Sequence, residues 1–114
     1  MDIEAIQKYC LSFPHATEDV KWGNDLVFSI GGKMFAVVVL DAASPVKVTF
    51  KCTPEMFAEL TEQKDILPAP YAARYHWVAL ARWDALSTKE LKARIKNSYE
   101  MVLAKLPKKV RQSL

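Results

Sequence analysis

The sequence is poor in the residues from which catalytic and cofactor-binding motifs are built. Its 114 residues include only three glycines, two cysteines and two histidines. The Gly31-Gly32 pair precedes a strand-like run, whereas a phosphate-binding glycine loop precedes a helix N-terminus. Two cysteines and two histidines are scattered without CxxC or HxxxH spacing: Cys10, His15, Cys52 and His76. Because closed metal sites need regularly spaced ligands, we predict no metal site and no cofactor.

The sequence also shows no nucleophile with an adjacent base. Cys52 precedes a predicted helix start, where the helix dipole favours a thiolate. Thr53 is the better cap for that helix, and Cys52 then ends a strand as a half-buried residue. We therefore predict no catalytic residue and expect that the protein is not an enzyme.

No apolar run approaches the roughly 20 residues that a membrane span needs. The first residues, Met1-Asp2-Ile3-Glu4, have neither the basic flank nor the continuous apolar core of a signal peptide. These features predict a soluble, cytoplasmic protein with no membrane partner, in which both cysteines are free thiols.

Length and charge distribution give the next constraints. A chain of 114 residues suits one domain, which we place over residues 1–114. The net charge of +3 is unevenly spread. Residues 1–30 carry two basic and five acidic side chains, residues 31–86 six of each, and residues 87–114 eight basic and two acidic. Such a basic end is suited to an anionic partner.

The Gly31-Gly32 pair lies between two β-prone runs and predicts a tight hairpin. Residues 26–30 alternate before it, and residues 33–40 form a β-branched run typical of a central strand with both faces covered. Residues 46–51 alternate between apolar and polar side chains, which indicates one buried and one exposed face. The three runs predict an antiparallel meander.

Helices are predicted on both sides of this meander. Residues 3–13 have apolar spacings of three and four, and Thr53-Pro54-Glu55 is a helix start, with its stripe continuing to about Gln63. Ser87-Thr88-Lys89-Glu90 is a capping box that begins the last long helix, which Pro107 ends before a short basic tail. Residues 17–22 form a loop or a short edge strand, residues 68–70 are extended and rigid, and residues 74–80 form an aromatic-rich strand.

This order of elements predicts a two-layer α+β domain, with an antiparallel sheet and helices on one face, in the approximate order α-β(3)-α-β(2)-α.

Short sequence pieces along nearly the whole chain carry a family resemblance. They are Cys10-Leu11-Ser12-Phe13-Pro14 with Ala16-Thr17-Glu18, Lys21-Trp22-Gly23-Asn24, Gly31-Gly32-Lys33-Met34-Phe35-Ala36, Lys51-Cys52-Thr53-Pro54-Glu55, Pro68-Ala69-Pro70-Tyr71, Arg74-Tyr75-His76-Trp77-Val78, Ser98-Tyr99-Glu100 and Lys105-Leu106-Pro107-Lys108-Lys109. With these pieces in this order, the chain resembles the MmcQ/YjbR family of small bacterial proteins. Phe13 departs from the pattern, which more often has leucine there, without consequence for function.

The resemblance implies an α+β fold similar to the CyaY-like and secretion-chaperone-like domains. Members are often described as DNA-binding, because their sheet is similar to the double wing of a phage transcription factor. This is an analogy of folds, and a fold alone does not determine function. The family has no established catalytic residues to carry over to this sequence.

Two sets of basic residues are candidates for contacts with nucleic acid. The first set shares one face of the hairpin and the following strand, where Lys47 and Lys51 alternate with apolar residues and Lys33 lies across the turn. The second set belongs to the basic end, where Lys89, Lys92 and Lys96 share one side of the last helix. Both sets also have a plainer interpretation as ordinary solvated faces.

Aromatic residues form a second candidate site. Tyr75, His76 and Trp77 follow Arg74, and Trp22 lies between Lys21 and a Gly23-Asn24 turn. A ring beside a cation can stack on a base or a flat ligand. The alternative for these rings is packing in the core, where aromatic side chains supply much of the buried area.

We therefore hold two hypotheses. The first is a small DNA-binding protein with phosphate contacts from Lys33, Lys47, Lys51, Lys89, Lys92 and Lys96, and with Arg74 or Asn24 supplying specificity. The second is a protein-interaction or small-ligand module whose site comprises Lys21, Trp22, Asn24, Tyr75, His76 and Trp77. In either case we expect a monomer.

Overall fold

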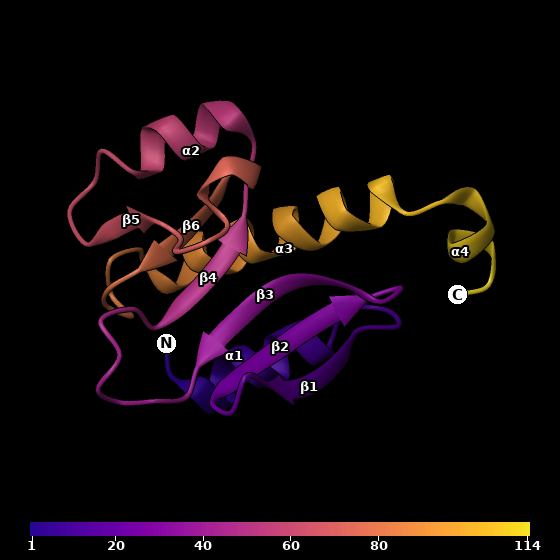
Figure 1. The fold of residues 1–114 in the computed structure, drawn as a ribbon, viewed down its shortest axis with the longest axis horizontal. Coiled ribbons are helices and arrows are strands. Elements are labelled where there is room, and N and C mark those ends of the chain that lie inside the picture. The colour runs from indigo at the N-terminus through magenta and orange to yellow at the C-terminus, as the bar shows by residue number, and fades with distance from the viewer.

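A six-stranded sheet with helices packed behind it forms the body of the molecule (Figure 1). The computed structural model describes all residues, 1–114. The helices are α1 (Ile3–Leu11), α2 (Pro54–Leu60), α3 (Thr88–Lys105) and α4 (Lys108–Gln112), with a 3₁₀ turn η1 (Ala73–Tyr75). The strands are β1 (Thr17–Lys21), β2 (Asp25–Ile30), β3 (Lys33–Val39), β4 (Val48–Lys51), β5 (Ile66–Pro68) and β6 (Trp77–Leu80).

All neighbouring strands are antiparallel, in the order β1-β2-β3-β4-β6-β5. Ile30 pairs with Lys33, so Gly31 and Gly32 form a two-residue hairpin turn with φ of 59° and 81°. Positive φ at both central residues is the conformation that glycine adopts most easily, which explains the pair. The predicted hairpin is confirmed.

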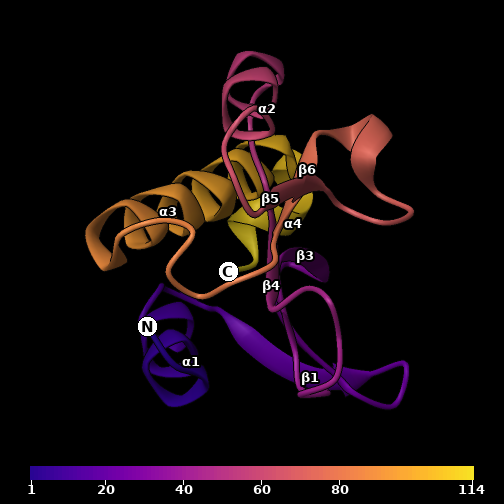
Figure 2. The same ribbon diagram turned by 90° about the vertical axis from the view of Figure 1, so that its left-hand side faces the viewer.

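The main core lies between the sheet and the helices. It contains 21 buried residues, including Phe28, Phe35 and Phe50 from the strands. Helix α3 contributes the predicted apolar stripe, of which Leu91 and Ile95 are fully buried. The Ser87 hydroxyl caps α3 by accepting a hydrogen bond from the Glu90 amide at 3.1 Å. In the edge-on view of Figure 2, α1 and α3 lie on one side of the sheet. The predicted α+β class, with an antiparallel sheet and helices on one face, is confirmed.

The other face of the sheet, called here the open face, is not covered by a helix. A smaller apolar cluster lies on it, consisting of Val27, Val37, Val46, Ala69, Trp77 and Ala79. The segment of residues 69–76, which includes η1, folds over part of this face (Figure 2). The middle of the open face is therefore apolar, and the residues of this cluster are buried.

Strands β3 and β4 diverge at one end because α3 inserts a side chain between them. Their pairing covers only three residue pairs, from Ala36 with Phe50 to Val38 with Val48. Beyond it, the Ser98 hydroxyl donates to the Phe35 carbonyl at 2.6 Å and accepts from the Lys51 amide at 3.0 Å. In Figure 1 the two strands spread apart with α3 visible behind the gap.

Several element boundaries differ from those predicted. Residues 17–21 form the edge strand, one of the two alternatives, and α1 and α2 end at Leu11 and Leu60, short of the predicted ends. The last strand begins only at Trp77, because residues 73–75 form η1 and His76 has a positive φ of 64°. The short edge strand β5 (Ile66–Pro68) was not predicted and overlaps the rigid segment of residues 68–70 only at Pro68. The basic tail contains the short helix α4.

Candidate functional site

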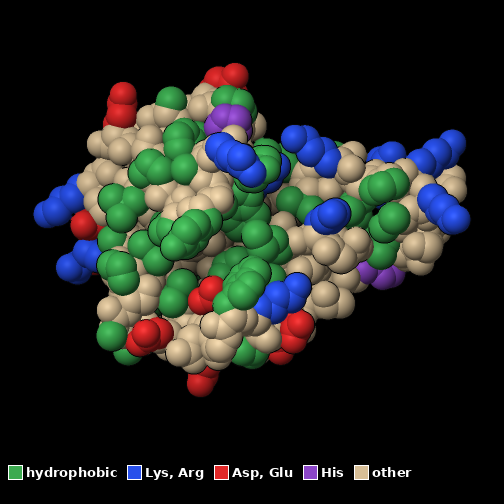
Figure 3. Space-filling view, viewed as in Figure 1, with side chains coloured by type: hydrophobic (Ala, Val, Ile, Leu, Met, Phe, Trp, Pro, Cys, Tyr) green, Lys and Arg blue, Asp and Glu red, His purple; other side chains and the backbone are tan.

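Two adjoining depressions lie on the open face, and both are lined by Met34 and Trp77. The larger one, called here the apolar hollow, has a volume of about 630 Å³. Its lining comprises Trp22, Asp25, Met34, Val37, Val39, Ser44, Val46, Thr49, Ala69, Pro70, Tyr71, Ala72 and Trp77. Figure 3 shows hydrophobic side chains gathered over this face, with Lys and Arg side chains at their border and along α3 and α4.

The smaller depression, called here the lysine groove, has a volume of about 440 Å³. Its lining comprises Lys33, Met34, Lys51, Tyr75, Trp77, Val102, Lys105, Leu106 and Pro107. The three lysines come from β3, β4 and α3, which are distant in the sequence. They converge because β3 and β4 diverge around Ser98, so that the end of α3 reaches the open face.

The lysine groove is electrostatically one-sided, since its lining contains three lysines and no acidic residue. Partial burial lowers the pKa of Lys51, and the positive charge of Lys105 lowers it further. Both effects disfavour the charged ammonium, and a bound anion would reverse the second. The groove is therefore arranged to attract an anionic group.

Aromatic rings border both depressions. Tyr75 is 52% exposed at the lysine groove, and the Arg74 guanidinium carbon lies 4.8 Å from the centre of its ring. Trp22 is 70% exposed and Tyr71 is fully exposed at the apolar hollow, whereas Trp77 between the two depressions is buried. Exposed rings of this size offer surfaces on which a flat ligand can stack.

The structure divides the basic residues proposed for nucleic acid into separate groups. Lys33 and Lys51 share the lysine groove, and Arg74 lies beside it through Tyr75. Lys47 lies elsewhere, because its Nζ donates to the carbonyls of Ala42 and Ser44 at 3.3 and 3.2 Å.

The helix lysines lie on the opposite side of the sheet. Lys92 Nζ is 5.3 Å from the ring centre of Tyr9 on α1, and the Tyr9 hydroxyl donates to the Lys92 carbonyl at 3.0 Å. Lys89 and Lys96 share that side of α3, at spacings of three and four. These three lysines therefore do not share one surface with Lys33 and Lys51.

The set proposed for a small ligand is also divided. Trp22 and Trp77 both line the apolar hollow. Lys21, which precedes Trp22 in the sequence, is exposed to solvent. Asn24 is an exposed turn residue whose carbonyl accepts from the Leu40 amide at 2.8 Å. Tyr75 belongs to the lysine groove.

His76 has a structural role outside both depressions. Its ring packs edge-on against Phe57 of α2, with centres 5.7 Å apart. Its carbonyl accepts from the Cys52 amide at 2.9 Å.

Lys105 lines the groove but is not one of the lysines predicted to contact phosphates. It belongs to the basic end of the chain, but nothing distinguishes it there from the other lysines and arginines. The signal that could have found it is its position at the end of the last helix, beside the buried Leu106.

Neither cysteine is placed to act as a nucleophile. Burial raises the pKa of the Cys10 thiol to about 12. Burial also raises the pKa of the Cys52 thiol, to about 11, although the nearby Arg94 opposes the rise. Both side chains are thus neutral thiols near neutral pH, and the Cys52 thiol donates to the His76 carbonyl at 3.4 Å. No three His, Cys, Asp or Glu side chains gather in a position to hold a metal ion.

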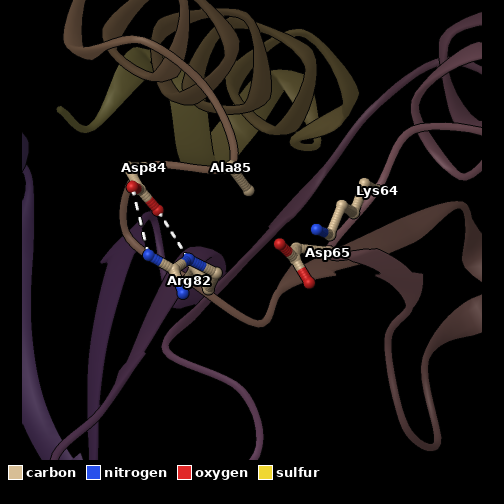
Figure 4. A pocket seen from close by; sticks show the side chains of 5 residues that line it. All are labelled: Lys64, Asp65, Arg82, Asp84 and Ala85. Atoms are coloured by element: carbon tan, nitrogen blue, oxygen red, sulfur yellow. Dashed lines mark hydrogen bonds and ion pairs between the residues drawn. The ribbon is translucent and has the colours of Figure 1, made fainter.

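A third depression, shown in Figure 4, is lined mostly by exposed charged side chains. Arg82 and Asp84 form an ion pair at 2.9 Å there, and the hydrogen bond and charge of Arg82 lower the pKa of Asp84. Lys64 and Asp65 add one further charge of each sign. Because its charges balance and its side chains are exposed, this notch offers little to a ligand.

Comparisons with known proteins place the chain among its relatives. The family model described as YjbR matches residues 11–101. A crystal structure of a Deinococcus radiodurans protein with a domain described as DUF419 superposes with a TM-score of 0.85 at 24% identity, covering 97% of this chain and 86% of that one. A Pseudomonas syringae protein superposes with a TM-score of 0.74 at 20% identity, covering 90% of this chain and 99% of that one. No curated protein matches the chain.

Proposed function

The chain belongs to the YjbR family, and we propose that it is a non-enzymatic DNA-binding protein that contacts phosphates through the lysine groove. The observation that carries this proposal is the convergence of Lys33, Lys51 and Lys105 in one depression without an acidic neighbour. Phosphate contacts supply much of the affinity of proteins for DNA, and they require several cations on one surface.

The proposed interface is smaller than the one expected from the sequence. It keeps Lys33, Lys51 and Arg74, gains Lys105, and leaves out the helix lysines that face α1. Three lysines line the groove and Arg74 lies beside it, so we expect the number of phosphates contacted to be small. A contact of this size predicts weak binding with a moderate dependence on salt.

The test is a salt titration of the affinity for DNA of mixed sequence, monitored by fluorescence anisotropy from 50 to 200 mM salt. Binding through three or four phosphates predicts a log–log slope of roughly −3, at about −0.9 per phosphate contacted. Replacing Lys33, Lys51 and Lys105 together by Gln should lower the affinity by at least about tenfold and flatten this slope.

The matched control is the triple replacement of Lys89, Lys92 and Lys96 by Gln, which removes the same charge from the α1 side. This control should keep its affinity within about twofold, since the lost charges lie away from the groove. Absence of binding at 50 mM salt, or an equal loss in the two triple variants, would contradict the proposal. Circular dichroism checks that both variants are folded.

A second candidate function is a small-ligand or protein-interaction module on the same face. The volume of the apolar hollow, about 630 Å³, favours it, because sites for small molecules commonly measure ~300–1,000 Å³. Trp22 would report such a ligand by a change in fluorescence. A metabolite panel that shifts the fluorescence of the unmodified protein but not of Trp22→Phe would support this candidate.

A further inference from the structure

We propose that the apolar hollow is a base-binding site, so that the protein binds single-stranded DNA in preference to duplex. This inference rests on the proposed contact between phosphates and the lysine groove. It goes further by assigning the neighbouring hollow to a nucleobase and by specifying the form of DNA that fits both depressions.

The two depressions form one continuous surface, of which the groove is positively charged and the hollow is mainly apolar. Met34 and Trp77 line both, so a ligand that fills one reaches the edge of the other. The groove contributes three positive charges, whereas the only charged side chain in the hollow is Asp25, which is negative. An anionic group is therefore favoured in the groove and disfavoured in the hollow.

This pairing matches the repeating unit of a nucleic-acid strand, which joins an anionic phosphate to a flat base. In a duplex the faces of the bases are hidden by stacking, and only the phosphates and the base edges are available. A single strand offers its bases to aromatic side chains as well, and stacking on such rings is tolerant of sequence. Trp22 and Tyr71 supply exposed rings at the hollow.

Polar groups in the hollow add a preference among bases. The Asp25 carboxylate is a hydrogen-bond acceptor, and Asp pairs with the amino group at N4 of cytosine. Thymine is a pyrimidine of similar size without that amino group. The hollow should therefore hold cytosine more tightly than thymine.

The experiment compares three fluorescein-labelled DNAs by anisotropy at 100 mM salt: oligo(dC), oligo(dT) and a duplex of mixed sequence. We expect oligo(dC) to bind at least about tenfold more tightly than the duplex, which is the range that one stacked base supplies. Trp22→Ala should lower the affinity for oligo(dC) about tenfold and change the affinity for the duplex less than twofold.

Two further variants sharpen the test. Asp25→Asn should reduce the ratio of oligo(dC) to oligo(dT) affinity while the salt slope stays the same, since an amide can donate as well as accept. Leu11→Ala is the matched control for Trp22→Ala, because Leu11 is a partly exposed apolar residue of α1 behind the sheet. The control should bind all three DNAs as the unmodified protein does.

The outcomes separate this inference from the proposed function. If the duplex binds as tightly as oligo(dC), with a steep salt slope, the inference that the hollow binds a base is wrong, but the proposal that the groove contacts phosphates is not contradicted. No binding of any DNA would overturn both. A dimer in sedimentation velocity that Trp22→Ala dissociates would show that a second copy covers the hollow, and would also overturn the inference.

Discussion

At the scale of single residues, Ser98 has the largest effect on the shape of the candidate site. It is the one polar residue among the 28 that are buried, and its hydroxyl joins the Phe35 carbonyl to the Lys51 amide. In an uninterrupted sheet those two backbone groups would lie on adjacent paired strands. Because a serine of α3 satisfies them instead, the strands can spread without leaving buried polar groups unpaired.

We predict that Ser98→Ala destabilises the protein by about 1–3 kcal/mol, because it removes the partner of the partly buried Lys51 amide and of the buried Phe35 carbonyl. Urea unfolding monitored by circular dichroism measures the change. Ser113→Ala, which removes an exposed hydroxyl near the C-terminus, is the control and should change stability by no more than about 0.5 kcal/mol. A loss at Ser98 no larger than at Ser113 would show that the bridging hydroxyl is dispensable.

At the scale of elements, the β2–β3 hairpin is held against the end of the chain. A Cβ atom at Gly31 would lie 2.6 Å from Leu106 Cδ1 and 3.1 Å from Val110 Cγ1, so this glycine packs directly under the α3–α4 junction. A Cβ atom at Gly32 would meet nothing within 4 Å. The two glycines of one turn therefore have different roles: both permit a positive φ, and only Gly31 permits a close approach.

This difference predicts unequal effects of the same substitution. Gly31→Ala and Gly32→Ala both place an alanine at positive φ, which costs about 1–2 kcal/mol. Gly31→Ala should cost at least about 1 kcal/mol more, because Leu106 and Val110 must move. Thermal or urea unfolding of the two variants measures the difference, and equal destabilisation would contradict the packing of the turn against α4.

At the scale of the whole molecule, one core connects all the layers. The 21 residues of the main cluster include side chains from α1, α2, α3 and all strands except β1. The Cα radius of gyration is 13.4 Å, close to the ~13 Å expected for a compact domain of about this length. The smaller cluster on the open face shares the same strands, so it has no independent support.

A single core predicts a single cooperative unfolding transition. Tryptophan fluorescence, in which Trp77 of the sheet is the buried reporter among three tryptophans, and far-ultraviolet circular dichroism, which reports the helices, should give coincident urea midpoints. Two separated transitions, with the helix signal lost at a different midpoint, would contradict the assignment of residues 1–114 to one domain.

The elements themselves were largely predictable because their signals are local. Gly31-Gly32 specifies its hairpin through backbone conformations that lie within two residues, and Ser87 specifies the start of α3 through a hydrogen bond to Glu90. Boundaries were less predictable, as His76 shows: its left-handed conformation delays β6 to Trp77, and no local pattern signals it. The sequence around Trp22 and Trp77 does not distinguish their burial, but Trp22 is exposed and Trp77 is buried.

The sequence by itself determined the fold class, the hairpin and the long capped helix, since each follows from periodicity or from residues that lie close together. Its motifs also carried the resemblance to the family, whose model matches residues 11–101. The tertiary structure alone decided which lysines meet. Lys33, Lys51 and Lys105 come together, while Lys92 faces α1. The physical reason is long-range packing: the Ser98 hydroxyl of α3 bridges two diverging strands, and the last residues of α3 line the groove beside them.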